Sequence, residues 1–223
     1  MYSLYNIVIC IGTIEILVSF LIAYKLRNKI ENSTFLSKFW ICPFIAFLIS
    51  TNTIIHEFFI HYNNSIHYSF QNILFILDLF FWAFYFLNLS NDKNYNTKIK
   101  VFLVLTLILY SLTLFANDSS KPNLHFFSTI NICKSLFCLL YYSELFKNIP
   151  DKNITKEPSF WIVTGLIFYS CISIPFYTLH VYIKELFPFN ISLNIFAISN
   201  VLIIMMHLFF LKAYLCIIRQ HKE

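Results

Sequence analysis

The chain has little charge, two glycines and no paired cysteine motif. Only 12% of its 223 residues are charged, about half the share found in soluble domains, and this excludes an ordinary soluble globular protein. Gly12 and Gly165 cannot supply the glycine-rich loop that binds nucleotide phosphates. None of the six cysteines forms a C-x-x-C sequence, so the spacing typical of thiol redox sites and structural zinc sites is missing. The sequence therefore gives no support for a kinase, a cyclase or a nucleotide-binding enzyme.

Long apolar runs take up most of the chain instead. Hydrophobic residues make up 58% of it and aromatic residues 20%, and about 20 apolar residues are enough to cross a bilayer. Runs bounded by Asn, Pro, Lys or Asp predict about seven spans, at residues 3–24, 39–60, 67–88, 100–116, 125–146, 159–183 and 191–217. The connections between them are too short to fold alone. We therefore expect an all-α membrane protein in which residues 1–223 form one bundle of about seven transmembrane helices, with no soluble domain.

Lysine and arginine lie mainly in alternate connections between these runs. They cluster after the first predicted span, around residues 93–100, around residues 147–156 and at the tail, whereas the other connections hold only Lys121 and Lys184. Cytoplasmic loops carry an excess of positive residues, so we expect the N-terminus outside and the C-terminus in the cytoplasm, in a bacterial inner membrane. The formal net charge of +5 then reflects topology, and the expected partner is the lipid bilayer, with no nucleic acid.

Three ionisable residues lie near the midpoints of predicted spans, where charge is costly and normally faces the bundle interior. They are Glu15, Asp78 and Lys134, and Asn131 and Asn200 complete the predicted buried polar core. Two carboxylates and one ammonium leave an excess negative charge. The simplest arrangement pairs Lys134 with one carboxylate and leaves the other protonated. Such a core is either a static ion pair beside a neutral acid or a proton-coupled switch.

Histidines and one carboxylate gather near the predicted outer face of the membrane, at His56, Glu57, His61, His125 and His180. These residue types bind zinc or copper and respond to pH. However, no H-E-x-x-H sequence occurs, and the adjacent His56 and Glu57 would point to different faces of a helix. We expect interfacial histidines without a bound metal or other cofactor. If a metal binds, His56 and His180 are its candidate ligands.

The sixth predicted span contains three residues that favour either close packing or a hinge. Trp161 suits the inner membrane interface, and Gly165 permits close approach of another helix. Pro175 interrupts the backbone hydrogen bonds of the span and should kink it. Packing alone accounts for these residues, and a hinge that transmits a signal is the alternative.

The stretch P-S-F-W-I-V-T-G-L-I-F-Y, which begins at Pro158, is the basis of a family resemblance. With Asn194 and Asn200 in the last span and Asp78 in an aromatic third span, it resembles a family of small seven-helix integral membrane proteins of Bacteroidetes. The resemblance covers nearly the whole layout, and F-W-x-x-x-G is its specific part. Members are often encoded near sensor histidine kinases, which implies a sensing or signalling accessory. That family has no established catalytic residues, and Lys134 departs from its usual fifth span.

The expected function is non-enzymatic sensing or signal relay in the membrane, through a sensor histidine kinase or another membrane partner. A proton-coupled transporter or permease is the first alternative, because two three-helix units joined by the short fourth span would bracket a site at the midplane. An intramembrane metal-dependent hydrolase is the second. Asn52, His56 and Asp78 are similar to residues of ceramidase-type membrane hydrolases, but the H-x-x-x-H of their last helix is missing around His207.

Overall fold

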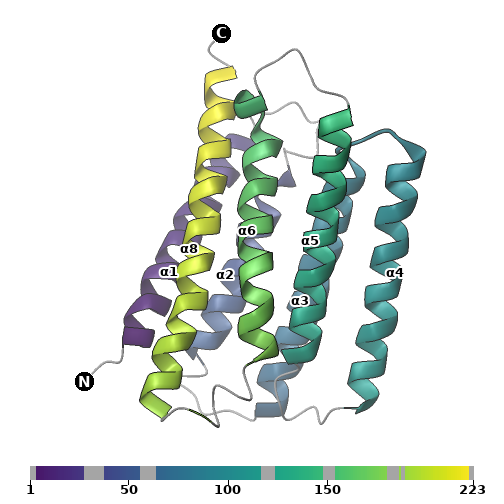
Figure 1. Cartoon of the computed structure of the whole chain (residues 1–223). Helices are drawn as coiled ribbons and strands as arrows, with labels where there is room; N and C mark the ends of the chain where they lie inside the picture. Colours follow the sequence, from purple (N-terminus) through teal and green to yellow (C-terminus); the bar gives the residue numbers. More distant parts are fainter. Residues whose placement is uncertain are drawn as a thin grey trace.

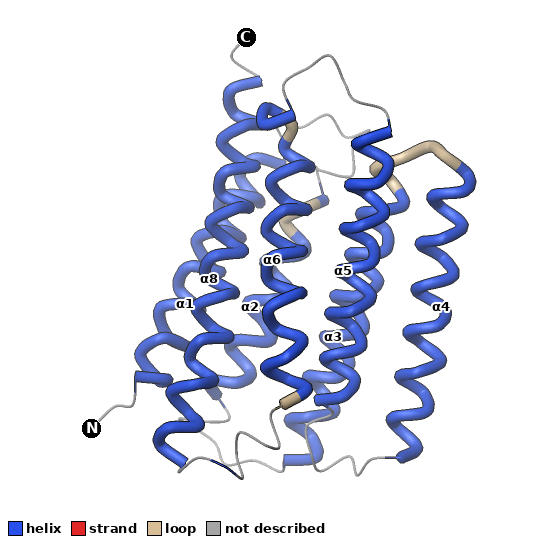
Figure 2. Tube along the Cα trace, in the orientation of Figure 1, coloured by secondary structure: helices blue, strands red, loops and turns tan. Residues whose placement is uncertain are grey.

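The computed structural model describes residues 4–27, 38–55, 64–116, 124–147, 154–179, 186 and 189–220. Within these ranges the regular structure is entirely helical (Figures 1 and 2). The long helices are α1 (Leu4–Leu26), α2 (Ile41–Ile54), α3 (Asn64–Leu87), α4 (Lys93–Ala116), α5 (Leu124–Lys147), α6 (Pro158–Thr178) and α8 (Phe189–Gln220), and η4 (Ile154–Lys156) is a short 3-10 helix. The all-α prediction is therefore confirmed for the described part of the chain.

Five of these helices are long and apolar enough to cross a membrane, over Ile7–Leu26, His67–Leu87, Lys93–Thr113, Pro158–Thr178 and Ile198–Gln220. The described part of α2 is apolar but has only 14 residues, and α5 is not among the five. The polar residues that α5 carries inside the bundle, above all Asn131 and Lys134, account for this difference. Length and composition thus identify five candidate spans.

Several helix ends differ from the ends of the predicted spans, and the start of α4 and the end of α6 are two clear cases. The fourth helix begins at Lys93, seven residues before the predicted start, because Asp92 caps it: the Asp92 carboxylate accepts hydrogen bonds from the backbone N–H of Asn94 (3.0 Å) and of Tyr95 (3.3 Å). The sixth helix ends at Thr178, three residues beyond Pro175, and not at residue 183. Apolar runs therefore mark spans well and helix ends poorly.

The helices run nearly parallel and antiparallel to one another as one bundle (Figure 1). The last helix, α8, packs between α1 and α6, α1 packs on α2, and α2 packs on α3. The fifth helix, α5, contacts α6, α4 and α3. The fourth helix lies at the edge of the bundle (Figure 1) and contacts α3 and α5. This order places α3 and α5 side by side, and it determines which buried charges meet.

The outward sides of the helices are apolar at helical spacing. On α1, Ile7, Ile11, Ile14, Val18 and Leu21 are exposed, whereas the opposite stripe from Ile9 through Ile16 to Ala23 is buried. On α4, Val104, Leu105, Ile108 and Leu112 are each about half-exposed. A helix that is apolar on all sides belongs in a large core or in a bilayer. A bundle with this surface exposes far more apolar area than soluble proteins tolerate.

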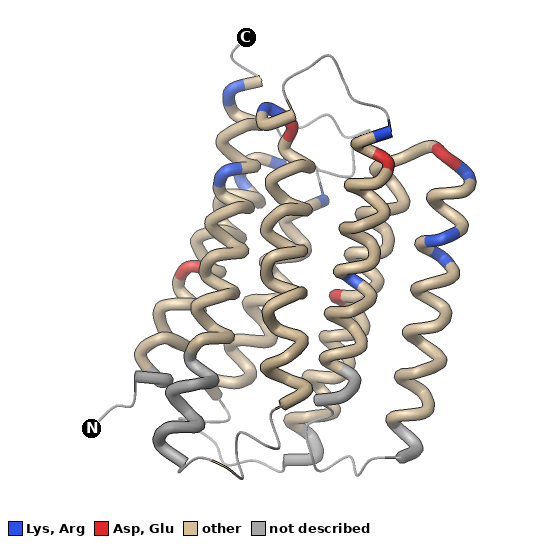
Figure 3. Tube along the Cα trace, viewed as in Figure 1, with Lys and Arg blue, Asp and Glu red and all other residues tan. Residues whose placement is uncertain are grey.

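The interior has a cluster of fully buried aromatic rings toward one end of the bundle. Phe39, Trp82 and Phe210 are almost fully buried; their rings meet with centroids 5.2 Å (Phe39 to Phe210) and 6.1 Å (Trp82 to Phe210) apart. These residues lie near the start of α2 and the ends of α3 and α8, the end at which most Lys and Arg lie (Figure 3). Interhelical polar contacts occur in both halves of the bundle, and the Asp78–Lys134 pair lies near the middle.

Candidate functional site

Asp78 and Lys134 form the ion pair at the centre of the candidate site. Lys134 Nζ donates to Asp78 Oδ2 across the contact between α3 and α5, and the side chains are only 15% (Asp78) and 7% (Lys134) exposed. It is the one ion pair within the described residues. The sequence left open which carboxylate pairs with Lys134, and the structure places Asp78 there because α3 packs against α5.

Trp82 completes the environment of the Asp78 carboxylate. Its indole Nε1–H donates to Asp78 Oδ1 at 3.0 Å from the next turn of α3, and its ring is 1% exposed. Both carboxylate oxygens therefore accept a hydrogen bond from a donor whose position is fixed by packing. A buried charge with good partners on each oxygen is much less costly than an unpaired one. The arrangement neutralises Asp78 and connects α3 to α5.

Glu15 lies apart from this pair. It is half-buried on α1, both of its carboxylate oxygens are buried, and neither has a hydrogen-bond partner within the described residues. The first helix packs chiefly against α2 and α8, so it does not present Glu15 to Lys134. The predicted core of two carboxylates and one ammonium is thus divided: the structure joins two members and leaves the third on another helix.

Asn131 belongs to the site, and Asn200 is not bonded to it. Asn131 is fully buried one turn before Lys134; its amide Nδ2 donates to the Phe127 carbonyl oxygen at 3.1 Å, and its Oδ1 has no partner in the described part of the chain. On the facing helix α6, the buried Ser170 Oγ is also without a described partner. Asn200 is half-buried on α8, and no hydrogen bond joins it to Asp78 or Lys134.

A second polar group lies between α2 and α3, farther from the basic end of the bundle. Asn52 Nδ2 and His67 Nδ1 are 3.1 Å apart, and both residues are buried. One turn farther along α3, Gln71 Nε2 donates to Thr53 Oγ1 at 3.1 Å. Sequence analysis did not identify these contacts. The predicted spans gave no signal for the contact of Asn52 with His67, because they place Asn52 eight residues inside the end of the second span and His67 at the first residue of the third. The two residues come to the same depth only with the observed ends of α2 and α3.

The third buried polar contact joins His207 on α8 to Ser19 on α1. His207 is fully buried, its Nδ1 lies 3.2 Å from Ser19 Oγ, and its ring packs edge-on against Phe210 with centroids 5.2 Å apart. From the sequence, we note only that no second histidine lies four residues from His207. The structure shows that its polar neighbour is a serine hydroxyl on another helix, a contact between distant segments that spacing along one helix cannot reveal.

The predicted outer-face cluster lies outside the described residues. This holds for His56, Glu57, His61 and His180, while the backbone of His125 lies in α5 and its side chain is not described. Within the described part of the chain, no three His, Cys, Asp or Glu side chains come together in a group that could hold a metal ion. The zinc and pH-sensing alternatives for these histidines stay predictions.

The sixth helix packs closely on α8 around Gly165. A Cβ atom at Gly165 would lie 2.7 Å from Phe209 Cβ and 3.1 Å from the Met206 carbonyl oxygen, so the contact requires glycine. One turn earlier, Trp161 stacks on Phe209 with centroids 6.2 Å apart and donates from Nε1 to the Thr155 carbonyl oxygen at 2.8 Å. Pro175 lies inside α6, one turn before its end. Around Gly165 the contact is tight packing between two helices.

Comparison of the chain with known protein families, with curated proteins and with solved structures finds no match. Any functional conclusion therefore depends on the residues and contacts described above.

Proposed function

We propose that this chain is a multi-span protein of a bacterial inner membrane that relays a signal to a partner protein through a movable polar core. The membrane part is supported most strongly by the apolar outward stripes of α1 and α4 together with five helices of sufficient length and hydropathy. Such a surface requires a solvent as apolar as lipid. In this proposal α2 and α5 also cross the bilayer, which makes seven spans.

The orientation follows from the distribution of charge. Most Lys and Arg residues of the described chain lie at the end of the bundle where the C-terminus lies, and the N-terminus lies at the other end (Figure 3). Positive residues favour the cytoplasmic side. The aromatic cluster then faces the cytoplasm and closes the bundle there, and the contact of Asn52 with His67 lies toward the outside. A signal that enters from outside would meet polar groups first and the Asp78–Lys134 pair next.

The Asp78–Lys134 pair is the element that would change state. It joins two different helices, and its loss would leave a buried charge on each. Protonation of Asp78, or a ligand that replaces one partner, removes the attraction between α3 and α5 and favours a second arrangement of the helices. In the second arrangement, the ends of α3 and α5 at the basic end would form a different surface, and a membrane partner would bind one of the two surfaces more tightly. A sensor histidine kinase is the class of partner that the family resemblance implies.

Distance measurements in nanodiscs test this role. Spin labels at Ser90→Cys, after α3, and Lys147→Cys, at the end of α5, report the separation of the two helices at the basic end; Cys10 and Cys171, the exposed native cysteines, are first replaced by serine. Asp78→Asn should add or favour a second distance population, whereas Lys212→Gln on α8 should leave the distribution unchanged. A folded Asp78→Asn protein with an unchanged distribution would contradict the switch.

The partner is tested separately in native membranes. Crosslinking before extraction, followed by affinity purification, should return one membrane protein in stoichiometric amount, and Asp78→Asn should alter its recovery. Purified protein that is always alone would count against signal relay and leave the membrane fold unaffected.

A proton-coupled transporter is the second candidate, and one observation favours it. Asn131, three residues before Lys134, and Ser170, on the adjacent α6, each have a buried oxygen without a described partner, and chains of such groups form proton paths in membrane transporters. Proteoliposomes with an internal pH dye distinguish the two functions. Proton flux that Asp78→Asn abolishes would establish transport; no flux above that of empty liposomes would exclude it.

A further inference from the structure

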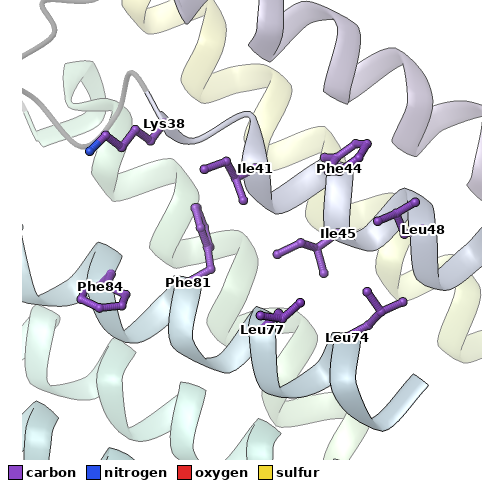
Figure 4. Close-up of a pocket in the computed structure, with 9 residues that line it drawn as sticks. All are labelled: Lys38, Ile41, Phe44, Ile45, Leu48, Leu74, Leu77, Phe81 and Phe84. Carbon is purple, nitrogen blue, oxygen red and sulfur yellow. The ribbon is translucent and has the colours of Figure 1, made fainter. Parts of the chain in front are cut away.

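An apolar groove lies on the outside of the bundle between α2 and α3. Its volume is about 530 Å³, and its lining consists of eight apolar side chains and one lysine (Figure 4). The floor is buried, with Ile45, Leu74 and Phe81 less than one-tenth exposed, and the rim is open, with Leu77 and Phe84 about half-exposed. The groove therefore lies along the contact of two helices and opens to the surroundings of the bundle.

The length of the groove matches one leaflet of a bilayer. Its lining runs from Lys38, three residues before α2, to Leu48 on that helix, and from Leu74 to Phe84 along α3. Ten residues of helix rise about 15 Å, which is half of a hydrocarbon core about 30 Å thick. The volume is in the range of cavities that bind small ligands. A single acyl chain, extended along the helices, fits these dimensions.

Positive charge lies at one end of the groove only. Lys38 is exposed at the left end of the groove in Figure 4 and forms no ion pair with another described residue. The second helix begins three residues later, and its N-cap residue Trp40 makes no side-chain capping hydrogen bond; an indole donates but cannot accept. The N-terminus of a helix carries partial positive charge. The Cys42 N–H already donates to the Phe39 carbonyl oxygen, and proline at the next position has no N–H. The preference for an anion at this end therefore depends mainly on the lysine ammonium, and the partial charge of the helix start adds to it.

We propose that the groove binds one anionic phospholipid, with its phosphate at Lys38 and the start of α2 and one acyl chain along the apolar lining toward Leu48 and Leu74. The site lies on the side of the bundle where most Lys and Arg residues gather (Figure 3), so the headgroup meets a positive environment in the same leaflet. The inference requires the chain to lie in a membrane, but it is independent of any signalling or transport role.

Native mass spectrometry tests the site. The full chain is reconstituted in equal amounts of phosphatidylglycerol and phosphatidylcholine, extracted in mild detergent and assayed for retained lipid. One phosphatidylglycerol should remain bound in preference to phosphatidylcholine. Lys38→Gln should reduce that preference about five-fold, since one lysine near the surface contributes about 1 kcal/mol toward anionic lipid. Lys98→Gln on α4 is the matched control, because it removes the same charge from the same end without touching the groove.

A second pair of variants tests the acyl-chain part. Leu77→Trp fills the groove from a half-exposed position and should reduce the retention of both lipids, whereas Leu112→Trp makes the same change on the exposed side of α4 and should not. Leu48→Trp replaces Leu77→Trp if the latter fails to give a monodisperse protein. Equal retention of the two lipids, or retention that neither groove variant alters, overturns the proposal. A lipid-free dimer that Leu77→Trp dissociates also overturns it and assigns the groove to a second copy.

Discussion

At the scale of single residues, the pairing of Asp78 determines the polar core. Its carboxylate accepts from Lys134 Nζ on one oxygen and from Trp82 Nε1 on the other. Neither donor is next to Asp78 in the chain, and each stabilises the buried carboxylate in a different way. The ammonium cancels the charge, and the indole fixes the side-chain rotamer of the acid. Removing one donor leaves the carboxylate buried and under-satisfied, and that cost is larger than the net value of the bond itself.

Lys134→Met should destabilise the protein by about 3 to 5 kcal/mol, because it strands the Asp78 charge inside the bundle. Chemical unfolding in a mixed micelle, followed by Trp fluorescence, measures the change. Adding Asp78→Leu should recover at least about 1 kcal/mol of the loss, since the double variant has no buried charge at this place.

Lys212→Met is the control for this cycle. Lys212 lies on α8 with its Nζ 5.5 Å from the centre of the Trp161 ring, and losing such a contact costs about 0.5 to 1 kcal/mol. If the effects of Lys134→Met and Asp78→Leu simply add, the two residues do not interact in the membrane, and Glu15 becomes the candidate partner of Lys134.

Trp82→Phe should cost about 1 to 3 kcal/mol beyond the loss of ring contacts, because Asp78 Oδ1 loses its donor in a buried position. The matched variant is Trp161→Phe, which removes an exposed indole hydrogen bond to the Thr155 carbonyl oxygen and should cost less. Thermal unfolding of the two variants side by side checks the ranking. A Trp161→Phe protein that is the less stable of the two would contradict the assigned role of Trp82.

At the scale of elements, the tightest helix contact in the described structure that involves a glycine is that of α6 with α8. The two glycines of the chain make the comparison direct. A Cβ at Gly165 would lie 2.7 Å from Phe209 Cβ, whereas a Cβ at Gly12 would lie 3.7 Å from Ile204 Cγ1, an ordinary contact. The same residue type therefore has a strict packing role on α6 and a tolerant one on α1.

Gly165→Ala should destabilise the bundle by about 1 to 3 kcal/mol through overpacking, and Gly12→Ala should be neutral or stabilising by up to about 1 kcal/mol through helix propensity. Melting temperatures in detergent compare the two single-methyl changes. Tolerance of alanine at both positions would show that α6 and α8 shift apart at little cost, as a sliding or hinge contact would. Loss of stability at Gly12 alone would contradict the helix packing described here.

At the scale of the whole molecule, the distribution of charge and of apolar surface favours one orientation of the bundle across a bilayer. Apolar stripes cover the outside of the bundle, and most charged side chains of the described chain lie at one end of it (Figure 3). The positive-inside rule favours one of the two placements of such a bundle in a bilayer, because insertion the other way would carry the basic end across the hydrocarbon region. Its topology is therefore open to a direct chemical test.

Ser90→Cys, in the connection between α3 and α4, should react with a membrane-impermeant maleimide only in inverted or permeabilised vesicles. The native Cys10 and Cys171 are the internal control. Their side chains are exposed in the structure, but they lie on apolar helices where lipid excludes the reagent, so the parent protein should label weakly from either side. Labelling of Ser90→Cys in intact cells would reverse the proposed orientation.

The sequence alone determined that the chain is helical and that several of its helices are long and apolar enough to cross a membrane. Apolar runs separated by polar clusters predicted helices close to the observed ones. A run of about 20 apolar residues has the length of a membrane span, and in lipid its backbone N–H and C=O groups must bond to one another, which a helix achieves within one segment. The sequence also identified Asp78 and Lys134 as buried and ionisable, since their depth in an apolar run is a local property. The helix ends were less predictable, as the cap by Asp92 shows.

Only the tertiary structure decided which of these residues meet. Lys134 pairs with Asp78 and not with Glu15 because α3 packs against α5, while α1 packs chiefly against α2 and α8. The contact of His207 with Ser19 follows from the same order of helices. Helices that are apolar on every side carry almost no signal of which face turns inward. Their neighbours are selected by the fit of distant side chains, at positions such as Gly165, and spacing along the chain does not record that fit.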